Sequence, residues 1–235
     1  MTVLIVGLDL GQKRDYSALV VAERVEYGLP VPTGHSDLGF HVRHVQRWRR
    51  GTPYTSVVED TAELMRSPEM QSWPMLVFDA TGVGGAVADL IHQAYRRGDL
   101  GECQFCPLGI TFTAGYSPGG AAAFGFNDNT AHKGDVIARM ALLLNTGRLL
   151  LPPGLPGGED LEKELRAYQI KQRKTGSVYT EAGKESDHDD LVTALCLAVW
   201  LGPLWGRDRQ RYVGSDGELH ENSDGPWYRG APPTH

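Results

Sequence analysis

The chain has 235 residues, of which 41% are hydrophobic and 22% are charged, and its formal net charge at pH 7 is −6. This length suits one large domain with or without a tail, and the negative balance argues against tight binding of nucleic acid by charge alone. The sequence contains no apolar run near the roughly 20 residues that span a membrane and no basic segment before its first apolar stretch, so we expect a cytoplasmic protein. Three cysteines do not make a disulfide framework.

The first fifty residues predict three antiparallel strands. Residues 3–10 and 16–25 are strongly apolar and are separated by a polar turn, which predicts a hairpin. Residues 28–37 contain Pro and Gly and predict a loop. In residues 40–48 one set of alternate positions includes Phe40, Val42 and Trp48, and the other includes Arg43 and Arg47. This alternation predicts a half-exposed strand.

Helices and further strands are predicted after this meander. Thr52 and Pro53 are typical of an N-cap followed by the first helical position. The later predicted elements are a strand at 74–79, a helix around 87–94, a strand at 104–110, helices at 132–145 and 160–170 with a short strand at 149–151 between them, and a buried helix at 191–201.

This order of elements predicts an α/β fold of the RNase H-like kind. An antiparallel N-terminal meander would be followed by parallel strands in one mixed β-sheet, which is flanked by helices. We expect the domain to cover residues 1–202, with residues 203–235 forming a polar, Gly/Pro-rich C-terminal tail that is flexible. Residues 115–129 predict a mobile loop, and residues 176–182 a small hairpin.

Aspartates stand at the edges of three apolar segments. Asp9 ends the first predicted strand, Asp79 ends the fourth, and Asp189 and Asp190 begin the last helix. If the first and fourth strands are parallel neighbours, their carboxylates reach the same edge of the sheet. Several buried carboxylates in one place need a cation, and Mg²⁺ or Mn²⁺ with oxygen ligands is the natural one.

Such a set of carboxylates predicts a metal-dependent nuclease. Two ions about 3.5–4 Å apart would clamp a scissile phosphate. Asp15 is a further candidate ligand, although it could also stabilise the turn through its own backbone. His188 and Lys133 are candidate contacts to the phosphate, but a loop histidine and a solvated lysine are the alternatives. For Asp189 and Asp190 the alternative is a helix cap alone.

Three segments resemble the nuclease motifs of phage large terminase subunits, in their C-terminal, RNase H-like nuclease domain. Residues 7–18 (GLDLGQKRDYSA) are similar to the first motif, residues 78–84 (FDATGVG) to the second and residues 187–195 (DHDDLVTAL) to the third. The resemblance covers about residues 3–202.

The resemblance implies an endonuclease that cuts concatemeric double-stranded DNA during the packaging of a viral genome, in the host cytoplasm. The metal-binding aspartates of the family would fall on Asp9, Asp79 and either Asp189 or Asp190, of which Asp190 is preferred. The implied partners are double-stranded DNA, a terminase ATPase motor domain or chain, the small terminase subunit and the portal.

This sequence differs from the family in one major feature, the ATPase. Packaging subunits of this family also carry an ATPase with a phosphate-binding loop, and this sequence contains no GxxxxGK[ST]. We therefore expect the chain to be the nuclease domain alone, with the motor on another segment or chain.

Two other interpretations stay open. An actin-like or sugar-kinase-type ATPase domain also begins with a strand and Asp-x-Gly, as in Asp9-Leu10-Gly11, and residues 79–82 could imitate its second phosphate loop. The chain is short for the two lobes of such an ATPase. A resolvase-type nuclease of the same fold is the other alternative.

Overall fold

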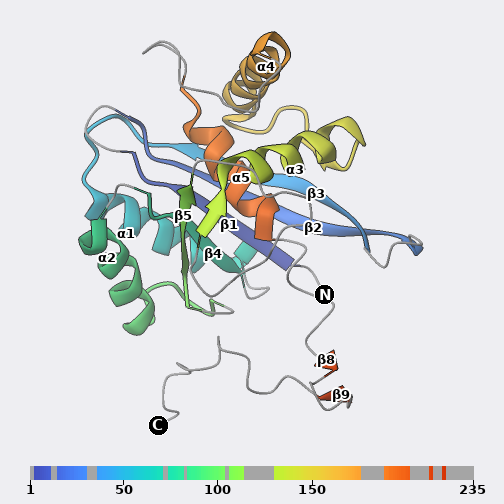
Figure 1. Cartoon of the computed structure of the whole chain (residues 1–235). Coiled ribbons are helices and arrows are strands. Elements are labelled where there is room, and N and C mark those ends of the chain that lie inside the picture. The colour runs from blue at the N-terminus through green and yellow to red at the C-terminus, as the bar shows by residue number, and fades with distance from the viewer. Residues whose placement is uncertain are drawn as a thin grey trace.

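A seven-stranded mixed sheet forms the centre of the molecule, in the order β6-β5-β4-β1-β2-β3-β7, and helices lie on both of its faces (Figure 1). The computed structural model describes residues 3–11, 15–30, 36–70, 74–81, 84–103, 106–113, 130–175, 188–201, 212–213 and 219–220. The strands of the sheet are β1 (Val3–Asp9), β2 (Ala18–Pro30), β3 (Ser36–Arg47), β4 (Met75–Asp79), β5 (Leu108–Thr113), β6 (Thr130–His132) and β7 (Leu149–Leu150). The helices are α1 (Tyr54–Met65), α2 (Gly84–Arg96), α3 (Lys133–Asn145), α4 (Gly158–Thr175), α5 (Asp190–Leu201) and the short 3-10 helix Pro68–Met70.

The direction of the strands confirms the predicted α/β, RNase H-like mixed sheet. Strands β1, β2 and β3 form an antiparallel meander. Strands β1, β4, β5 and β6 are successive parallel neighbours, and β7 runs parallel to β3. Parallel neighbours need crossover connections, and α1 and α2 supply the first two of them.

Several element boundaries differ from the prediction. The loop expected at 28–37 is shorter, because β2 continues to Pro30 and β3 begins at Ser36. The predicted N-cap at Thr52 is wrong: Pro53 is the residue before the helix, and the Thr52 hydroxyl donates to the carbonyl oxygen of Arg49 instead. Strand β6 was not predicted, since three residues carry too little periodicity to be recognised.

Side chains of β1 alternate between two hydrophobic cores. Leu4, Val6 and Leu8 pack in the core beneath α1 and α2. Ile5 points to the opposite core, which includes residues of α3, α4 and α5. By the two-residue period of a strand, Asp9 also belongs to the α5 side.

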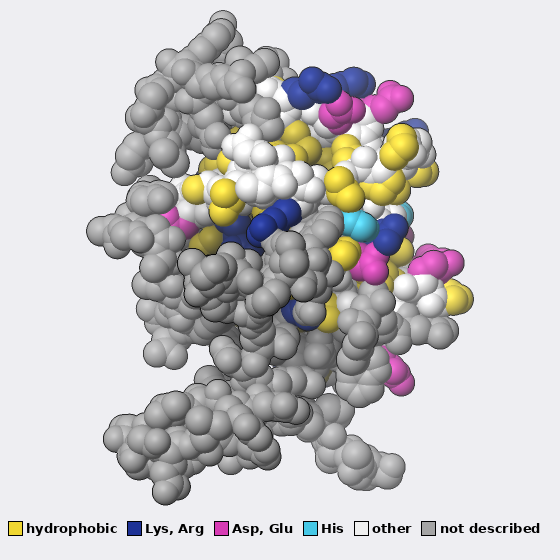
Figure 2. Space-filling model, turned by 90° about the vertical axis from the view of Figure 1, so that its right-hand side faces the viewer, with side chains coloured by type: hydrophobic (Ala, Val, Ile, Leu, Met, Phe, Trp, Pro, Cys, Tyr) yellow, Lys and Arg dark blue, Asp and Glu magenta, His cyan; other side chains and the backbone are white. Residues whose placement is uncertain are grey.

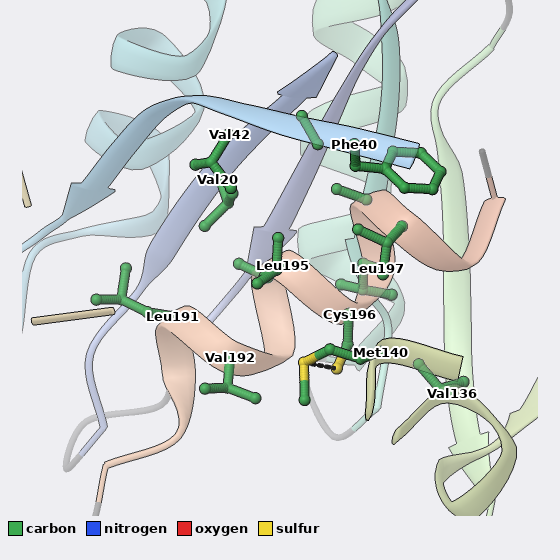
Figure 3. Packing of buried hydrophobic residues seen from close by; sticks show 14 of the residues in the cluster. Val20, Phe40, Val42, Val136, Met140, Leu191, Val192, Leu195, Cys196 and Leu197 are labelled. Carbon is green, nitrogen blue, oxygen red and sulfur yellow. Dashed lines mark hydrogen bonds between the residues drawn. The ribbon is translucent and has the colours of Figure 1, made fainter. Parts of the chain in front are cut away.

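Helix α5 is buried, as predicted from its apolar sequence. Figure 3 shows that Leu191 and Leu195 point toward the strands, whereas Val192 and Cys196 point toward Met140 of α3. The Cys196 thiol lies 3.4 Å from the Met140 sulfur. A helix that packs on both sides needs no polar face, which explains why its sequence is apolar all round.

The face that carries α3 and α4 is partly apolar. Figure 2 shows charged side chains of both signs at its upper end and a band of hydrophobic side chains below them. Leu142 and Leu150 are exposed there at 60% and 44%. A groove is lined mainly by the connection between β7 and α4 and by the first turns of α4, and none of the candidate site residues lines it.

None of the helices that the structure describes is long and apolar enough to cross a membrane. Of residues 203–235 the structure describes only β8 (Tyr212–Val213) and β9 (Leu219–His220), which pair with each other. The loop at 115–129 and the hairpin at 176–182 lie outside the described residues, and the domain boundary at residue 202 stays a prediction.

Candidate functional site

Asp9 and Asp79 end neighbouring parallel strands. The register pairs Leu8 of β1 with Phe78 of β4, so the two aspartates occupy the next position on each strand. Neighbouring strands are about 4.8 Å apart, and residues at matching positions of parallel strands point to the same face. Val77, two residues before Asp79, packs in the core on the α5 side. Both carboxylates therefore belong to that side of the sheet.

Gly7 sets the position of α5 along β1. A Cβ atom at Gly7 would overlap the carbonyl oxygen of Ala194 and lie 2.9 Å from the amide nitrogen of Ala198, so the helix backbone rests directly on the strand. Asp9 follows Gly7 by about 6.7 Å along the strand, and Asp190 precedes Ala194 by four residues, about 6 Å along the helix. Because the charge of Asp190 also raises the pKa of Asp9, the end of β1 and the start of α5 lie at the same edge of the sheet.

The charges of Asp79, Asp189 and Asp190 all act on Asp9, and we call these four residues the acidic cluster. Burial raises the pKa of Asp9 well above its ordinary value, and the charges of Asp79, Asp190 and Asp189 raise it further. Lys133 is the charge that opposes this shift.

Burial is the largest cause of a raised pKa at both Asp79 and Asp190, but their neighbours differ. Burial is the largest cause that raises the pKa of Asp79, and hydrogen bonding from Thr81 opposes it, with the Thr81 amide donating to Oδ1 over 2.6 Å. Burial and the charge of Asp189 raise the pKa of Asp190 to about 6, while Arg47 opposes the shift. The cluster thus carries more negative charge than its surroundings balance.

Asp189 and Asp190 are adjacent in the sequence, but their side chains lie in different environments. Asp190 is only 6% exposed, and its Oδ2 atom accepts no hydrogen bond from the described residues. The Asp189 side chain is 42% exposed, and its Oδ2 lies 3.6 Å from the ammonium nitrogen of Lys133. An orphaned buried oxygen is the better candidate for a metal ligand, which favours Asp190.

Lys133 is brought to the acidic cluster by β6. This strand pairs with β5 and leads directly into α3, so the first residue of the helix stands at the same edge of the sheet. Burial acts to lower the pKa of Lys133, but Tyr168, Asp189, Cys196 and Asp9 together raise it. The lysine therefore stays charged beside the carboxylates.

The donor atoms of the acidic cluster are those that hard divalent cations prefer. Carboxylate oxygens bind Mg²⁺ and related ions, and a cation would relieve the uncompensated charge. Among the described residues, however, no group of three or more His, Cys, Asp or Glu side chains is arranged to hold a metal ion. A metal site here requires the carboxylates to turn toward a common ion.

Glu164 of α4 caps the first turn of α5, a role that the sequence analysis missed. Its Oε2 atom accepts from the backbone amides of Leu191 and Val192, over 3.1 and 3.3 Å, and its Oε1 atom forms an ion pair with Arg47. The signal in the sequence was its position between Leu161 and Leu165, in the stripe that faces the core.

Replacing Glu164 by alanine is expected to destabilise the protein by about 3 kcal/mol, because two helix amides and a partly buried arginine lose their partner. Urea denaturation measures this change. Glu162→Ala is the matched control: Glu162 is exposed and pairs with Arg166 one turn away, so its loss should cost under about 0.5 kcal/mol. Equal costs for the two variants would contradict the capping role.

Three polar side chains lie against the aromatic ring of Tyr16. We call Tyr16, Arg47, Arg50 and His188 the Tyr16 cluster. The guanidinium carbons of Arg47 and Arg50 lie 5.2 and 4.6 Å from the centre of the ring. The His188 ring meets it edge-on, with 4.8 Å between centroids. Asp15, the neighbour of Tyr16, is exposed, and its charge contributes to the raised pKa of Asp190.

The raised pKa of Asp190 predicts how the metal-free protein responds to pH. Its folded form takes up a proton near pH 6 and its unfolded form near pH 4, so the folded state binds more protons between these values. Stability in EDTA should therefore fall as the pH rises from about 4 to about 6. Chemical denaturation across this range should show a smaller fall for Asp190→Asn; identical slopes would contradict the assignment.

Comparisons with known proteins concern the fold. No family model and no curated protein matches the chain. The large terminase nuclease from the thermophilic phage G20c is similar with a TM-score of 0.45 and 21% identity, covering 84% of this chain and 81% of that one. Two structures of the human cytomegalovirus terminase nuclease domain are also similar. The Mn-soaked one has a TM-score of 0.49 and 10% identity, covering 84% of this chain and 82% of that one. The other has a TM-score of 0.48 and 12% identity, covering 85% of this chain and 82% of that one. At these identities the function rests on the residues of this chain.

Proposed function

We propose that this chain is a divalent-metal-dependent endodeoxyribonuclease, the nuclease of a viral DNA-packaging terminase. The observation that carries the proposal is the convergence of four carboxylates from β1, β4 and α5 on one edge of the sheet, with a raised pKa at Asp9, Asp79 and Asp190. Burying several carboxylates together costs free energy, and a bound cation would offset that cost.

The residues divide the work of holding metal and substrate. Asp9, Asp79 and Asp190 would ligate Mg²⁺ or Mn²⁺, with Asp189 beside them. Two such ions would activate a water molecule and stabilise the leaving 3′-oxygen of the phosphodiester. Lys133 holds a positive charge beside Asp189, where it can also attract a phosphate of the DNA. Asp15 is exposed and remains a lower-ranked candidate ligand.

The proposed partners follow from the resemblance of the motifs. They are double-stranded DNA, an ATPase motor domain or chain, a small terminase subunit and a portal. Because the net charge is −6, binding of DNA without these partners should be weak and sensitive to salt. We also propose that residues 1–202 form the nuclease domain.

The alternative ATPase is not favoured. The described residues form one lobe around one large sheet, together with the two-stranded pair β8–β9. An actin-like or sugar-kinase-type ATPase needs two lobes around its nucleotide. No feature of the described part of the chain favours a resolvase-type nuclease over the proposed one.

Cleavage of supercoiled plasmid tests the proposal. Nicking and linearisation should occur with Mg²⁺ or Mn²⁺ and stop with EDTA. Asp79→Asn should abolish them while the protein stays folded, and Asp89→Asn, on the exposed side of α2, should cut like the parent. Cleavage that is independent of metal, or an active Asp79→Asn variant, would contradict the proposal.

A further inference from the structure

Arg50 joins the Tyr16 ring to His188. Its Nη2 atom lies 2.8 Å from Nε2 of His188, and its guanidinium carbon lies 4.6 Å above the centre of the Tyr16 ring. The three residues come from separate places: Tyr16 precedes β2, Arg50 follows β3, and His188 precedes α5. Stacking on an aromatic face restrains the guanidinium group, so its position relative to His188 is held by the fold.

The contact between Arg50 and His188 determines which nitrogen of the histidine carries the proton. A guanidinium group has donors and no acceptor, so it can only donate to Nε2. Nε2 must then be unprotonated, and the proton of the neutral ring is on Nδ1.

The protonated nitrogen faces the acidic cluster. His188 Nδ1 lies 3.9 Å from Oδ2 of Asp190, the buried oxygen that accepts no hydrogen bond from the described residues. This separation is longer than a direct hydrogen bond, and a shift of about 1 Å would form one. Nδ1 is therefore close to a carboxylate oxygen of the cluster that is buried without a hydrogen-bond partner among the described residues.

We propose that Arg50, stacked on Tyr16, fixes the tautomer of His188 and so orients Asp190 for metal binding. Arg50 and Tyr16 are positioning residues, acting through His188 on a ligand, and this inference rests on the proposed function. A group that hydrogen-bonds to a metal ligand sets the orientation and basicity of that ligand. Removing such a group usually lowers metal affinity by about 10–100-fold.

Titration of the full chain with Mn²⁺, without DNA, tests the inference by calorimetry. Arg50→Ala should weaken Mn²⁺ binding by about 10-fold, within the range for such outer groups. Arg49→Ala is the matched control, because Arg49 is the adjacent exposed arginine, and it should bind Mn²⁺ like the parent.

A second pair of variants separates orientation from a general loss of structure. His188→Ala removes the donor and should weaken Mn²⁺ binding as Arg50→Ala does. His188→Asn can place an amide N–H where Nδ1 was and should recover much of the affinity. In the His188→Ala background, adding Arg50→Ala should change the affinity little, because residues that act through one another are not additive.

The outcomes distinguish this inference from the proposed function. If Arg50→Ala binds Mn²⁺ like Arg49→Ala, the inference is overturned, even where DNA binding falls, because Arg50 is then a phosphate contact only. If the parent binds Mn²⁺ and cuts DNA in that case, the proposed function stands. If the parent neither binds Mn²⁺ nor cuts DNA, both fail.

Discussion

Replacing Asp9 by asparagine is expected to abolish metal-dependent cleavage and, at the same time, to stabilise the metal-free protein. Asp9 is held among other carboxylates, and burial raises its pKa most. Removing one charge relieves this repulsion and the cost of burying it, and should therefore raise the free energy of unfolding in EDTA. Loss of a ligand should lower cleavage by at least about 1,000-fold, since metal ions contribute several kcal/mol to the transition state.

Two measurements on the same sample check this expectation: urea denaturation in EDTA and plasmid cleavage in Mn²⁺. Asp89→Asn serves as the control for both, because Asp89 is exposed on α2, and its stability should change by less than about 0.5 kcal/mol. A variant that is less stable than the parent in EDTA and still cuts DNA would show that Asp9 is a structural residue.

Replacing Gly7 by alanine is expected to cause a large loss of stability, about 3 kcal/mol or more. The added methyl group would overlap the backbone of α5 at Ala194 and lie 2.9 Å from the amide nitrogen of Ala198. Backbone atoms of a buried helix cannot move aside as a side chain can, so the whole helix must shift. The shift would also move Asp190 relative to Asp9 and weaken Mn²⁺ binding.

Gly109 offers a matched control in β5. An alanine there would approach the ring of Phe78, at 2.8 Å from its Cζ atom, and the methyl group of Ala80. These are side-chain atoms, so we expect a cost of about 1–2 kcal/mol for Gly109→Ala. Thermal and urea unfolding compare the two. A cost for Gly7→Ala no larger than that for Gly109→Ala would contradict the close packing of α5 on β1.

Much of the fold could be predicted because its signals are local. The apolar runs of β1 and β4, each ending in an aspartate, predicted two buried strands and the edge where they meet. The apolar sequence of α5 predicted a helix buried on all sides, which the positions of Leu195 and Cys196 confirm (Figure 3). The parallel order of β1 and β4 followed from the helix between them.

The parts that could not be predicted depend on contacts between distant segments. Glu164 lies in the core-facing stripe of α4, but only the fold shows that it caps α5. Tyr16 and Arg50 lie far apart in sequence from His188, and no spacing pattern links them. Strand β6 is too short to recognise alone, yet it brings Lys133 to the acidic cluster.

A crystal structure of the chain soaked in Mn²⁺ would show whether the acidic cluster binds metal, because anomalous difference density locates the ion itself. We expect manganese peaks between β1, β4 and the start of α5, with carboxylate oxygens of Asp9, Asp79 and Asp190 at about 2.0–2.2 Å. Anomalous density at other positions with none at this edge of the sheet would contradict it.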